Sequence, residues 1–204
     1  PQGTLFGRNT PAGVVKFDSA RPSNKLEGYG SISFGTFTTV NAEGAANVPL
    51  NSDMALRVSV LNQSRSDWVN NQNPTGPTQK LEGYRDSALR TQFLFEPDKD
   101  LSVLANVHAR DYKGSARLFR ANIIQPGTND LVPGFDPKKI TIDGKNTSEV
   151  QNYGGNLRVR VGLGGLALYS ITGLETVHTY SRGDIDGGTP TGPGTIPFQS
   201  ETAD

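Results

Sequence analysis

Hydrophobic and polar residues alternate with a period of two along much of the chain. From Val40 to Leu50 the even positions are apolar or small, and most of the odd positions are polar. Residues two apart share one face of a β-strand, so this pattern predicts a strand with one apolar and one polar face. The same pattern predicts strands near Leu26–Phe37, Met54–Gln63, Ser87–Glu96, Leu101–Tyr112, Tyr153–Leu163 and Leu166–Tyr180.

The predicted strands are long and carry arginines on their polar face. Their length of about ten to fourteen residues exceeds the five or six usual in soluble sheets and fits the ~9–11 residues of a strand that crosses a bilayer. A soluble β-sandwich would explain the alternation equally well, because one face of each strand would then form its core. The polar-face arginines are Arg57, Arg90, Arg110, Arg158 and Arg160.

The connections between the predicted strands favour the membrane barrel over the sandwich. Short and long connections alternate, with one short exception at Gly35–Thr38, and outer-membrane barrels have short turns on one rim and long loops on the other. The short connections are Pro49–Asp53, Pro97–Asp100 and Gly164–Gly165, and the long ones are Ser64–Arg85, Gly114–Val150 and the stretch from Arg182 onward.

The composition agrees with this interpretation and excludes several classes of protein. Only 34% of the 204 residues are hydrophobic and the mean hydropathy is −0.47, as expected if every second strand residue faces lipid. Twenty basic and twenty acidic residues cancel, so the net charge does not indicate a nucleic-acid partner. The sequence has no cysteine, which excludes disulfides and thiolate metal sites.

The opening run, PQGTLFGRNTPAGVVKF, is dense in glycine and proline. It is one residue short of a phosphate-binding P-loop, and Arg8 stands where that motif has lysine. The residues themselves therefore favour a glycine-rich turn that leads into a strand.

This run resembles the end of the plug domain of TonB-dependent outer-membrane receptors. Ala12 departs from the resemblance, because a second glycine is commoner there. The later segments EGYGSISFGTF and VNAEGAANVPLNSDMALRVSV are similar to the first barrel strands of such receptors, and YSITGLETVHTYSRGD to a strand rising to an outer loop. The matching plug residues are Pro1, Gly3, Leu5, Phe6, Gly7, Asn9, Gly13 and the pair Arg21-Pro22.

The resemblance implies an all-β fold in two parts. Residues 1–22 would form the C-terminal end of the plug, and residues 23–204 the N-terminal part of the barrel. Receptor barrels of this kind have about 22 strands, so about seven strands would make a partial antiparallel transmembrane β-barrel, and we expect the chain to be a fragment.

The resemblance also implies a function in the bacterial outer membrane. Such receptors bind a scarce nutrient at their outer loops and plug, usually a ferric siderophore and in some members a carbohydrate or cobalamin. They import it with energy transmitted by TonB and are not enzymes. The expected partners are the TonB complex, the nutrient, and outer-membrane lipid and lipopolysaccharide, with no cofactor and no nucleic acid.

Candidate ligand contacts lie in the two long loops. Arg117, Phe119 and Arg120 place two cations and an aromatic ring in one loop, where they could attract an anionic complex. Solvation, or contact with anionic lipopolysaccharide, explains the same residues. Trp68 and Tyr84 flank the other loop and are expected first as interfacial aromatics and second as ligand contacts.

No catalytic or metal site emerges from the sequence. His108 and His178 fall on different predicted strands without metal-ligand spacing. The run 184–187, DIDG, begins like a calcium loop but lacks the downstream acidic ligand, so a turn is favoured. A soluble carbohydrate-binding β-domain stays as an alternative, whereas a passive porin would have no plug.

Overall fold

The computed structural model describes residue 15 and residues 18–188 and 199–203. The opening run 1–17, apart from residue 15, therefore lies outside the described residues, whereas Arg21-Pro22 lies within them. The described part is all β. It contains no helix long and apolar enough to cross a membrane. The strands are β1 (Glu27–Gly35), β2 (Thr39–Pro49), β3 (Met54–Arg65), β4 (Val69–Asn71), β5 (Lys80–Leu81), β6 (Tyr84–Phe95), β7 (Leu101–Gly114), β8 (Lys139–Ile140), β9 (Thr147–Leu163), β10 (Leu166–Asp184) and β11 (Gln199–Ala203).

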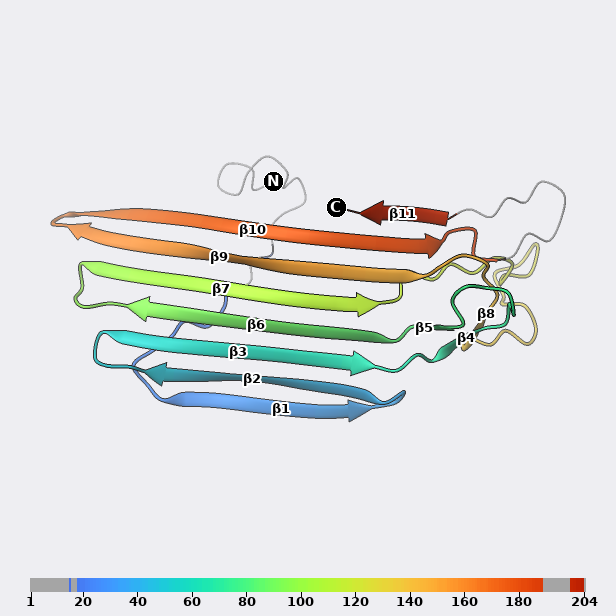
Figure 1. Ribbon diagram of the computed structural model, residues 1–204, viewed down its shortest axis with the longest axis horizontal. Coiled ribbons are helices and arrows are strands. Elements are labelled where there is room, and N and C mark those ends of the chain that lie inside the picture. Colours follow the sequence, from blue (N-terminus) through green and yellow to red (C-terminus); the bar gives the residue numbers. More distant parts are fainter. Residues whose placement is uncertain (1–14, 16–17, 189–198, 204) are drawn as a thin grey trace.

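Seven long strands form one antiparallel sheet in chain order, β1-β2-β3-β6-β7-β9-β10, and the short β11 pairs with β10 (Figure 1). All seven predicted strands are therefore confirmed. The short connections that follow β2, β6 and β9 gather at one end of the sheet, which is the left end in Figure 1. The long loops and the short connection between β1 and β2 lie at the other end. We call these the turn end and the loop end.

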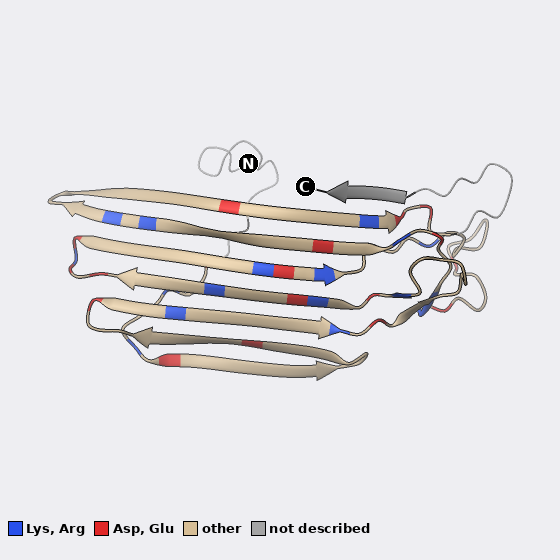
Figure 2. Cartoon of the chain, in the orientation of Figure 1, with Lys and Arg blue, Asp and Glu red and all other residues tan. Residues whose placement is uncertain are grey.

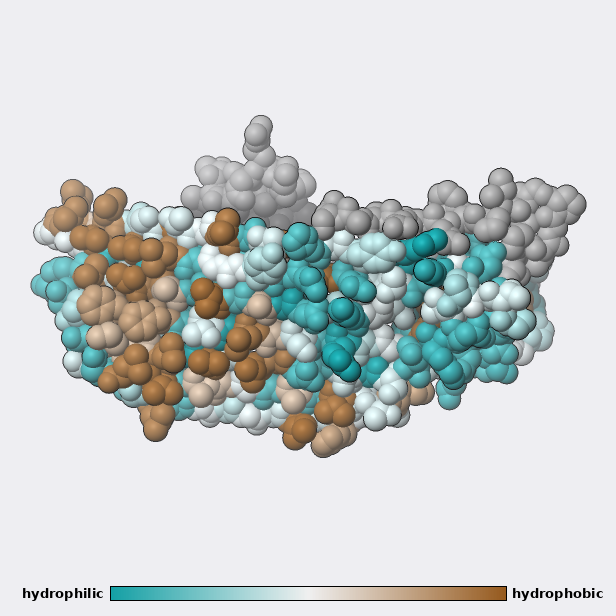
Figure 3. Space-filling model, viewed as in Figure 1, coloured by the Kyte–Doolittle hydropathy of each residue, from teal (hydrophilic) through white to brown (hydrophobic). Residues whose placement is uncertain are grey.

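The pairing register brings the apolar positions of all seven strands onto one face. Val60, Leu89, Ala109 and Tyr153, for example, lie opposite one another across β3, β6, β7 and β9. Figure 3 shows the resulting surface, which is brown toward the turn end and teal toward the loop end. We call this apolar surface, which includes Val60, Leu89, Ala109 and Tyr153, the apolar band. No second sheet covers it among the described residues, as a soluble sandwich would require.

The apolar band ends at one row of polar residues that continues across five strands. Within this row the amide of Asn62 donates to the Ser87 hydroxyl over 2.8 Å, and that of Gln151 to Asp111 over 3.4 Å. On β9 the band runs from Tyr153 to Leu163, and a strand tilted by ~40° spans about 26 Å of height over that length, close to the ~25 Å band of outer-membrane barrels. The row consists of Asn62, Ser87, Asp111, Gln151 and His178.

The opposite face carries arginines and other polar residues, with apolar residues such as Leu94 and Leu104 toward the turn end. Alternation and register place all five predicted arginines on it, together with His108. The prediction that the charges of the strands share one face is therefore confirmed for these residues.

The sequence did not predict the packing of the two long loops. Strands β5, β4 and β8 form a second, three-stranded sheet at the loop end, and its buried core consists of Val69, Leu81, Ile140 and Ile142. The side chain of Asn71 joins the loops, because its amide donates to the carbonyls of Thr78 and Ile142, each over 2.9 Å. We call this unit the loop cluster.

Strands β9 and β10 are longer than predicted. Their pairing continues past the apolar band to Thr147 opposite Arg182. The added residues are mostly polar on both faces, so alternation in the sequence could not reveal them. The loop cluster lies past the ends of β3 and β6 at the loop end (Figure 1).

Candidate functional site

The polar face of the sheet holds two adjoining hollows near its centre, of about 540 and 500 Å³. Arg90, Gln92 and His108 line both of them. The first also reaches Arg57, and the second reaches Arg158. The hollows therefore carry several cationic side chains and lie opposite the apolar band.

Ion pairs and amides fix the side chains around the first hollow. Arg110 makes a two-pronged pair with Asp86, with nitrogen–oxygen distances of 2.8 and 2.7 Å. His108 lies 3.0 Å from Glu175, which also accepts a hydrogen bond from Asn152. These contacts hold the polar groups around the hollow in fixed positions.

The segment before β1 crosses this polar face, and we call residues 18–26 the strap. Its anchor is the side chain of Asn47, which is completely buried. The Asn47 carbonyl oxygen accepts from the Ser23 backbone N–H at 2.9 Å. Its amide donates to the Ser23 carbonyl at 2.8 Å and also to the Lys25 carbonyl. One asparagine thus satisfies the backbone where the strap turns into the sheet.

Weaker contacts hold the earlier part of the strap. Arg21 donates to Glu96 over 3.2 Å, and its side chain is more than half exposed. Arg90 donates to the Ser19 hydroxyl from the centre of the polar face. These exposed contacts contribute little compared with the buried Asn47 anchor.

The charged groups are concentrated at the loop end. Figure 2 shows charged residues clustered along the loop-side ends of β6 and β7 and in the loops beyond them. The predicted ligand residues lie in the same region. Arg117 and Phe119 are exposed, whereas Arg120 is half-buried and donates to the Pro137 carbonyl over 2.8 Å.

The loop that carries Arg120 packs against the bend after β10. Ala121 donates its N–H to the Gly187 carbonyl over 2.9 Å. A Cβ at Gly187, where φ is +70°, would lie 2.7 Å from the Arg120 nitrogen, so glycine fits this contact and a side chain does not. Arg120 is therefore held in place, and Arg117 extends freely from the same loop.

The two flanking aromatics differ in their surroundings. Trp68 packs on the loop cluster and stacks on Phe37 with ring centroids 5.2 Å apart. Tyr84 faces the polar side of the sheet, where it stacks with Tyr112 and lies beneath the Arg65 guanidinium, 5.0 Å away. The interpretation of Tyr84 as an interfacial aromatic is therefore wrong, because alternation places it on the face opposite the apolar band.

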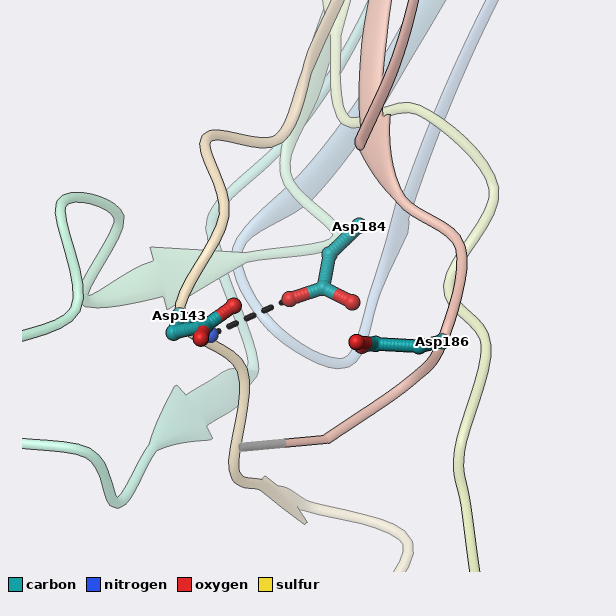
Figure 4. Close-up of side chains that lie close together, drawn as sticks. All are labelled: Asp143, Asp184 and Asp186. Atoms are coloured by element: carbon teal, nitrogen blue, oxygen red, sulfur yellow. Dashed lines mark hydrogen bonds between the residues drawn. The ribbon is translucent and has the colours of Figure 1, made fainter. Parts of the chain in front are cut away.

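Three carboxylates meet where the loop cluster joins β10 (Figure 4). The ligand oxygens of Asp143, Asp184 and Asp186 lie within 4.8 Å of one another, close enough for one cation. Asp184 is 2% exposed, and its carboxylate accepts backbone N–H groups from Asp143, Gly144 and Gly187, each over 3.0 Å. These amides account for its burial without an ion, since they satisfy both of its oxygens.

Burial, followed by the hydrogen bond that protonated Asp184 donates to Asp186, raises the pKa of Asp184 to about 6. Because the folded-state pKa lies above the ordinary 3.8, Asp184 stabilises the loop cluster fully below about pH 3.8, and this stabilisation is lost as the pH rises through 6. Trp68 is the single tryptophan and reports on the cluster. We expect its fluorescence to give a higher urea midpoint at pH 4 than at pH 7.5.

The control for this prediction is Asp184→Asn, which cannot titrate. The difference in midpoint between the two pH values should shrink in this variant. A pH dependence equal to that of the wild type would assign the effect to other carboxylates.

No family model matches the sequence. The structure, however, is similar to two solved receptors. One is the ferric yersiniabactin uptake receptor FyuA from Yersinia pestis, with a TM-score of 0.72 and 16% identity over 89% of this chain. The other is the ferric-catecholate import receptor Fiu from E. coli K12, with a TM-score of 0.69 and 15% identity over 100% of this chain.

The chain has the fold of part of a TonB-dependent receptor. It spans less than a third of either solved receptor, 28% of FyuA and 30% of Fiu. The predicted fold class, a partial antiparallel barrel of about seven long strands, is thereby confirmed. At these identities the likeness concerns the fold, and the ligands of the two receptors belong to those proteins.

The sequence did not predict the roles of Asn47, which binds the strap, or Glu175, which pairs with His108. Asn47 was one of several polar residues on its strand, and Glu175 interrupts an otherwise uncharged stretch of β10. Their partners, Ser23 and His108, lie 24 and 67 residues away in sequence. A single charge inside a long uncharged strand was the one available signal, and it pointed to Glu175.

Proposed function

We propose that this chain forms the end of the plug (residues 1–22) and the first barrel strands (residues 23–204) of an outer-membrane receptor that imports a ferric siderophore with energy from TonB. The observation that carries the proposal is the division of the sheet into an apolar band on one face and a charged, hollowed face on the other. Two iron-import receptors of known structure share this fold.

The two faces have complementary parts in this function. The apolar band faces lipid, and the polar face borders the lumen through which the nutrient passes. The loop cluster supplies a packed outer rim from which Arg117 and Phe119 extend toward an incoming anionic complex. The strap keeps the end of the plug attached to the barrel at Asn47, while the exposed contacts of Ser19 and Arg21 are easily broken when the plug moves.

The direct test is iron uptake by the full-length protein. It would be expressed in a bacterial strain without receptors of its own and supplied with radiolabelled ferric siderophores of the catecholate, hydroxamate and phenolate classes. We expect uptake of at least one class, and we expect it to stop when TonB is deleted. Uptake of none of them, with correct insertion of the protein, would refute the siderophore assignment and leave carbohydrate and cobalamin to be tested.

Replacing Arg117 should weaken binding of an anionic complex without disturbing the fold. Arg117 is exposed, so Arg117→Ser removes one exposed attraction of about 0.2–1 kcal/mol, which corresponds to at most about a fivefold loss of affinity. The loss should shrink as salt rises, because exposed charges are screened. Binding to the purified receptor would be measured at low and high salt.

The matched control is Lys145→Ser, which removes one cation from an exposed position elsewhere in the same loop. It should leave binding unchanged. Equal losses in the two variants would mean that the receptor attracts anions only through its overall charge. Arg120 is not used here, since its contact with Pro137 makes its replacement structural as well as electrostatic.

A further inference from the structure

The turn between β1 and β2 has an unusual backbone. The Thr39 N–H donates to the Thr36 carbonyl over 3.2 Å, and the two residues between them, Phe37 and Thr38, have φ values of +59° and +55°. A turn with two positive φ values normally has Asn-Gly at its centre, because other side chains crowd the backbone in this region. Thr38 is β-branched, which makes the region more unfavourable still. The turn is therefore strained, and a glycine in place of Thr38 would relieve part of the strain.

Contacts with the loop cluster hold the turn in this conformation. The Phe37 ring stacks on the Trp68 ring with centroids 5.2 Å apart and planes inclined by 22°. The Lys138 ammonium, from the other long loop, lies 5.9 Å from the centre of the Phe37 ring. The Phe37 carbonyl accepts the Ser66 N–H over 2.9 Å, at the point where the first long loop leaves β3. One residue of the first hairpin thus contacts both of the loops that build the cluster.

Another strained position lies where the first long loop returns to the sheet. Glu82, just before β6, has a φ of +71°. Its carbonyl accepts from Nε and Nη2 of Arg65 over 2.9 and 2.6 Å, and its N–H donates to the Ser115 hydroxyl over 2.8 Å. Strained backbone persists only where surrounding contacts hold it, and it is concentrated in segments that switch conformation. The loop between β3 and β6 therefore has a strained contact at its beginning and a strained residue at its end.

The loop cluster has space beside it. A hollow of about 850 Å³ lies at the loop end. Its lining includes Thr38 and Val40 from the first hairpin and Lys80 and Gly83 from the first long loop. A shift of the cluster relative to the hairpin would therefore change the shape of this hollow.

We propose that the β1–β2 turn is a latch for the loop cluster. In the latched state, which this structure shows, Phe37 stacks on Trp68 and the turn is strained. In the unlatched state the ring leaves Trp68, the backbone of Phe37 and Thr38 returns to ordinary φ values, and the cluster shifts against the sheet. The strain opposes the stack, so the two states lie closer in free energy than they would with an unstrained contact. The cluster is thereby held ready to move.

Hydrogen exchange of the full-length protein in detergent micelles, followed by mass spectrometry of its peptides, would measure the latch. The reporters are four backbone amides that bond carbonyls within the cluster over 2.7 to 3.0 Å, those of Trp68, Asn70, Asn71 and Gln72. These amides exchange when their hydrogen bonds open, so their exchange rate follows the population of the opened cluster.

The two central residues of the turn should act in opposite directions. Phe37→Ala removes the stack, and the reporter amides should exchange about twofold to tenfold faster. Thr38→Gly removes strain from the latched state alone, and the same amides should exchange about twofold to fivefold more slowly. Phe37→Tyr retains the ring and should exchange like the wild type. A contact without stored strain would not be tightened by Thr38→Gly.

The matched control is Phe119→Ala, because Phe119 also lies at the loop end and is 42% exposed, against 40% for Phe37. It should leave the reporter amides unchanged. The proposal would be overturned by an unchanged rate in Phe37→Ala, by a rate in Thr38→Gly that is not slower than in the wild type, or by equal acceleration in Phe119→Ala. Equal acceleration in peptides of β6 and β7 would also overturn it, because the Phe37 ring would then support the whole sheet. Exchange is measured without a ligand, so the result is independent of the iron-uptake test.

Discussion

A lysine at Ala105 should destabilise the membrane-inserted protein by about 2–4 kcal/mol, the usual penalty for a cation at the bilayer midplane. Ala105 lies in the middle of the apolar band, opposite Phe93 and Leu157. A lysine there has no aqueous partner and would place its charge in hydrocarbon. The full-length protein would be unfolded with urea from lipid vesicles, and its free energy of unfolding compared with that of the wild type.

The matched control is Asn156→Lys at the same height on the opposite face. Asn156 lines the second hollow of the polar face. A lysine there would meet water and should cost less than half of the Ala105→Lys penalty. Equal penalties would contradict the division into lipid and lumen faces. A larger penalty at Asn156 would mean that the polar face packs against protein, as in a soluble domain.

The sequence predicted the long strands well because a strand with one apolar and one polar face shows a clear alternation with a period of two. Alternation from Val40 to Leu50 and from Leu101 to Tyr112 already placed Glu43 and Arg110 on the face opposite the apolar residues, and the register confirmed it. The antiparallel order also followed from the short turns, since each joins two neighbouring strands. Local pattern was enough for these features.

The loop cluster could not be predicted because it depends on contacts between distant segments and not on a local pattern. Its core joins isolated apolar residues of two separate loops, Val69 and Leu81 in one and Ile140 and Ile142 in the other. Leu81 stands alone among polar residues, and Ile140 and Ile142 form a single alternating pair, which is too short to predict a strand. The buried Asn71, which bonds Ile142 over a separation of 71 residues, shows that these contacts are non-local.

The candidate site was predicted only in part. Sequence reasoning found the cationic loop with Arg117 and Arg120, but not the contact that fixes Arg120 against Pro137. It also gave no sign that Arg85 and Lys113 lie side by side at the loop end, as the pairing of β6 with β7 shows.

Replacing Asn47 with alanine should be among the most damaging single changes in the chain. The side chain is fully buried and satisfies the Ser23 N–H and the carbonyls of Ser23 and Lys25. Alanine would leave these backbone groups without partners, at a cost of about 1–3 kcal/mol for each that stays buried, so we expect a loss of about 2–4 kcal/mol after relaxation. Urea unfolding of the vesicle-inserted protein would measure it.

The damage should begin at the strap. Once the Asn47 anchor is lost, the bond after Lys25 becomes accessible, and trypsin should cut there faster than in the wild type. Asn41→Ala is the control, because Asn41 lies on the same face of the same strand and makes one long side-chain bond, to Ser33 at 3.3 Å. It should change stability by less than about 1 kcal/mol. If both alanine variants were equally stable and equally resistant to trypsin, the strap would be held by its exposed contacts at Ser19 and Arg21, and Asn47 would not be its anchor.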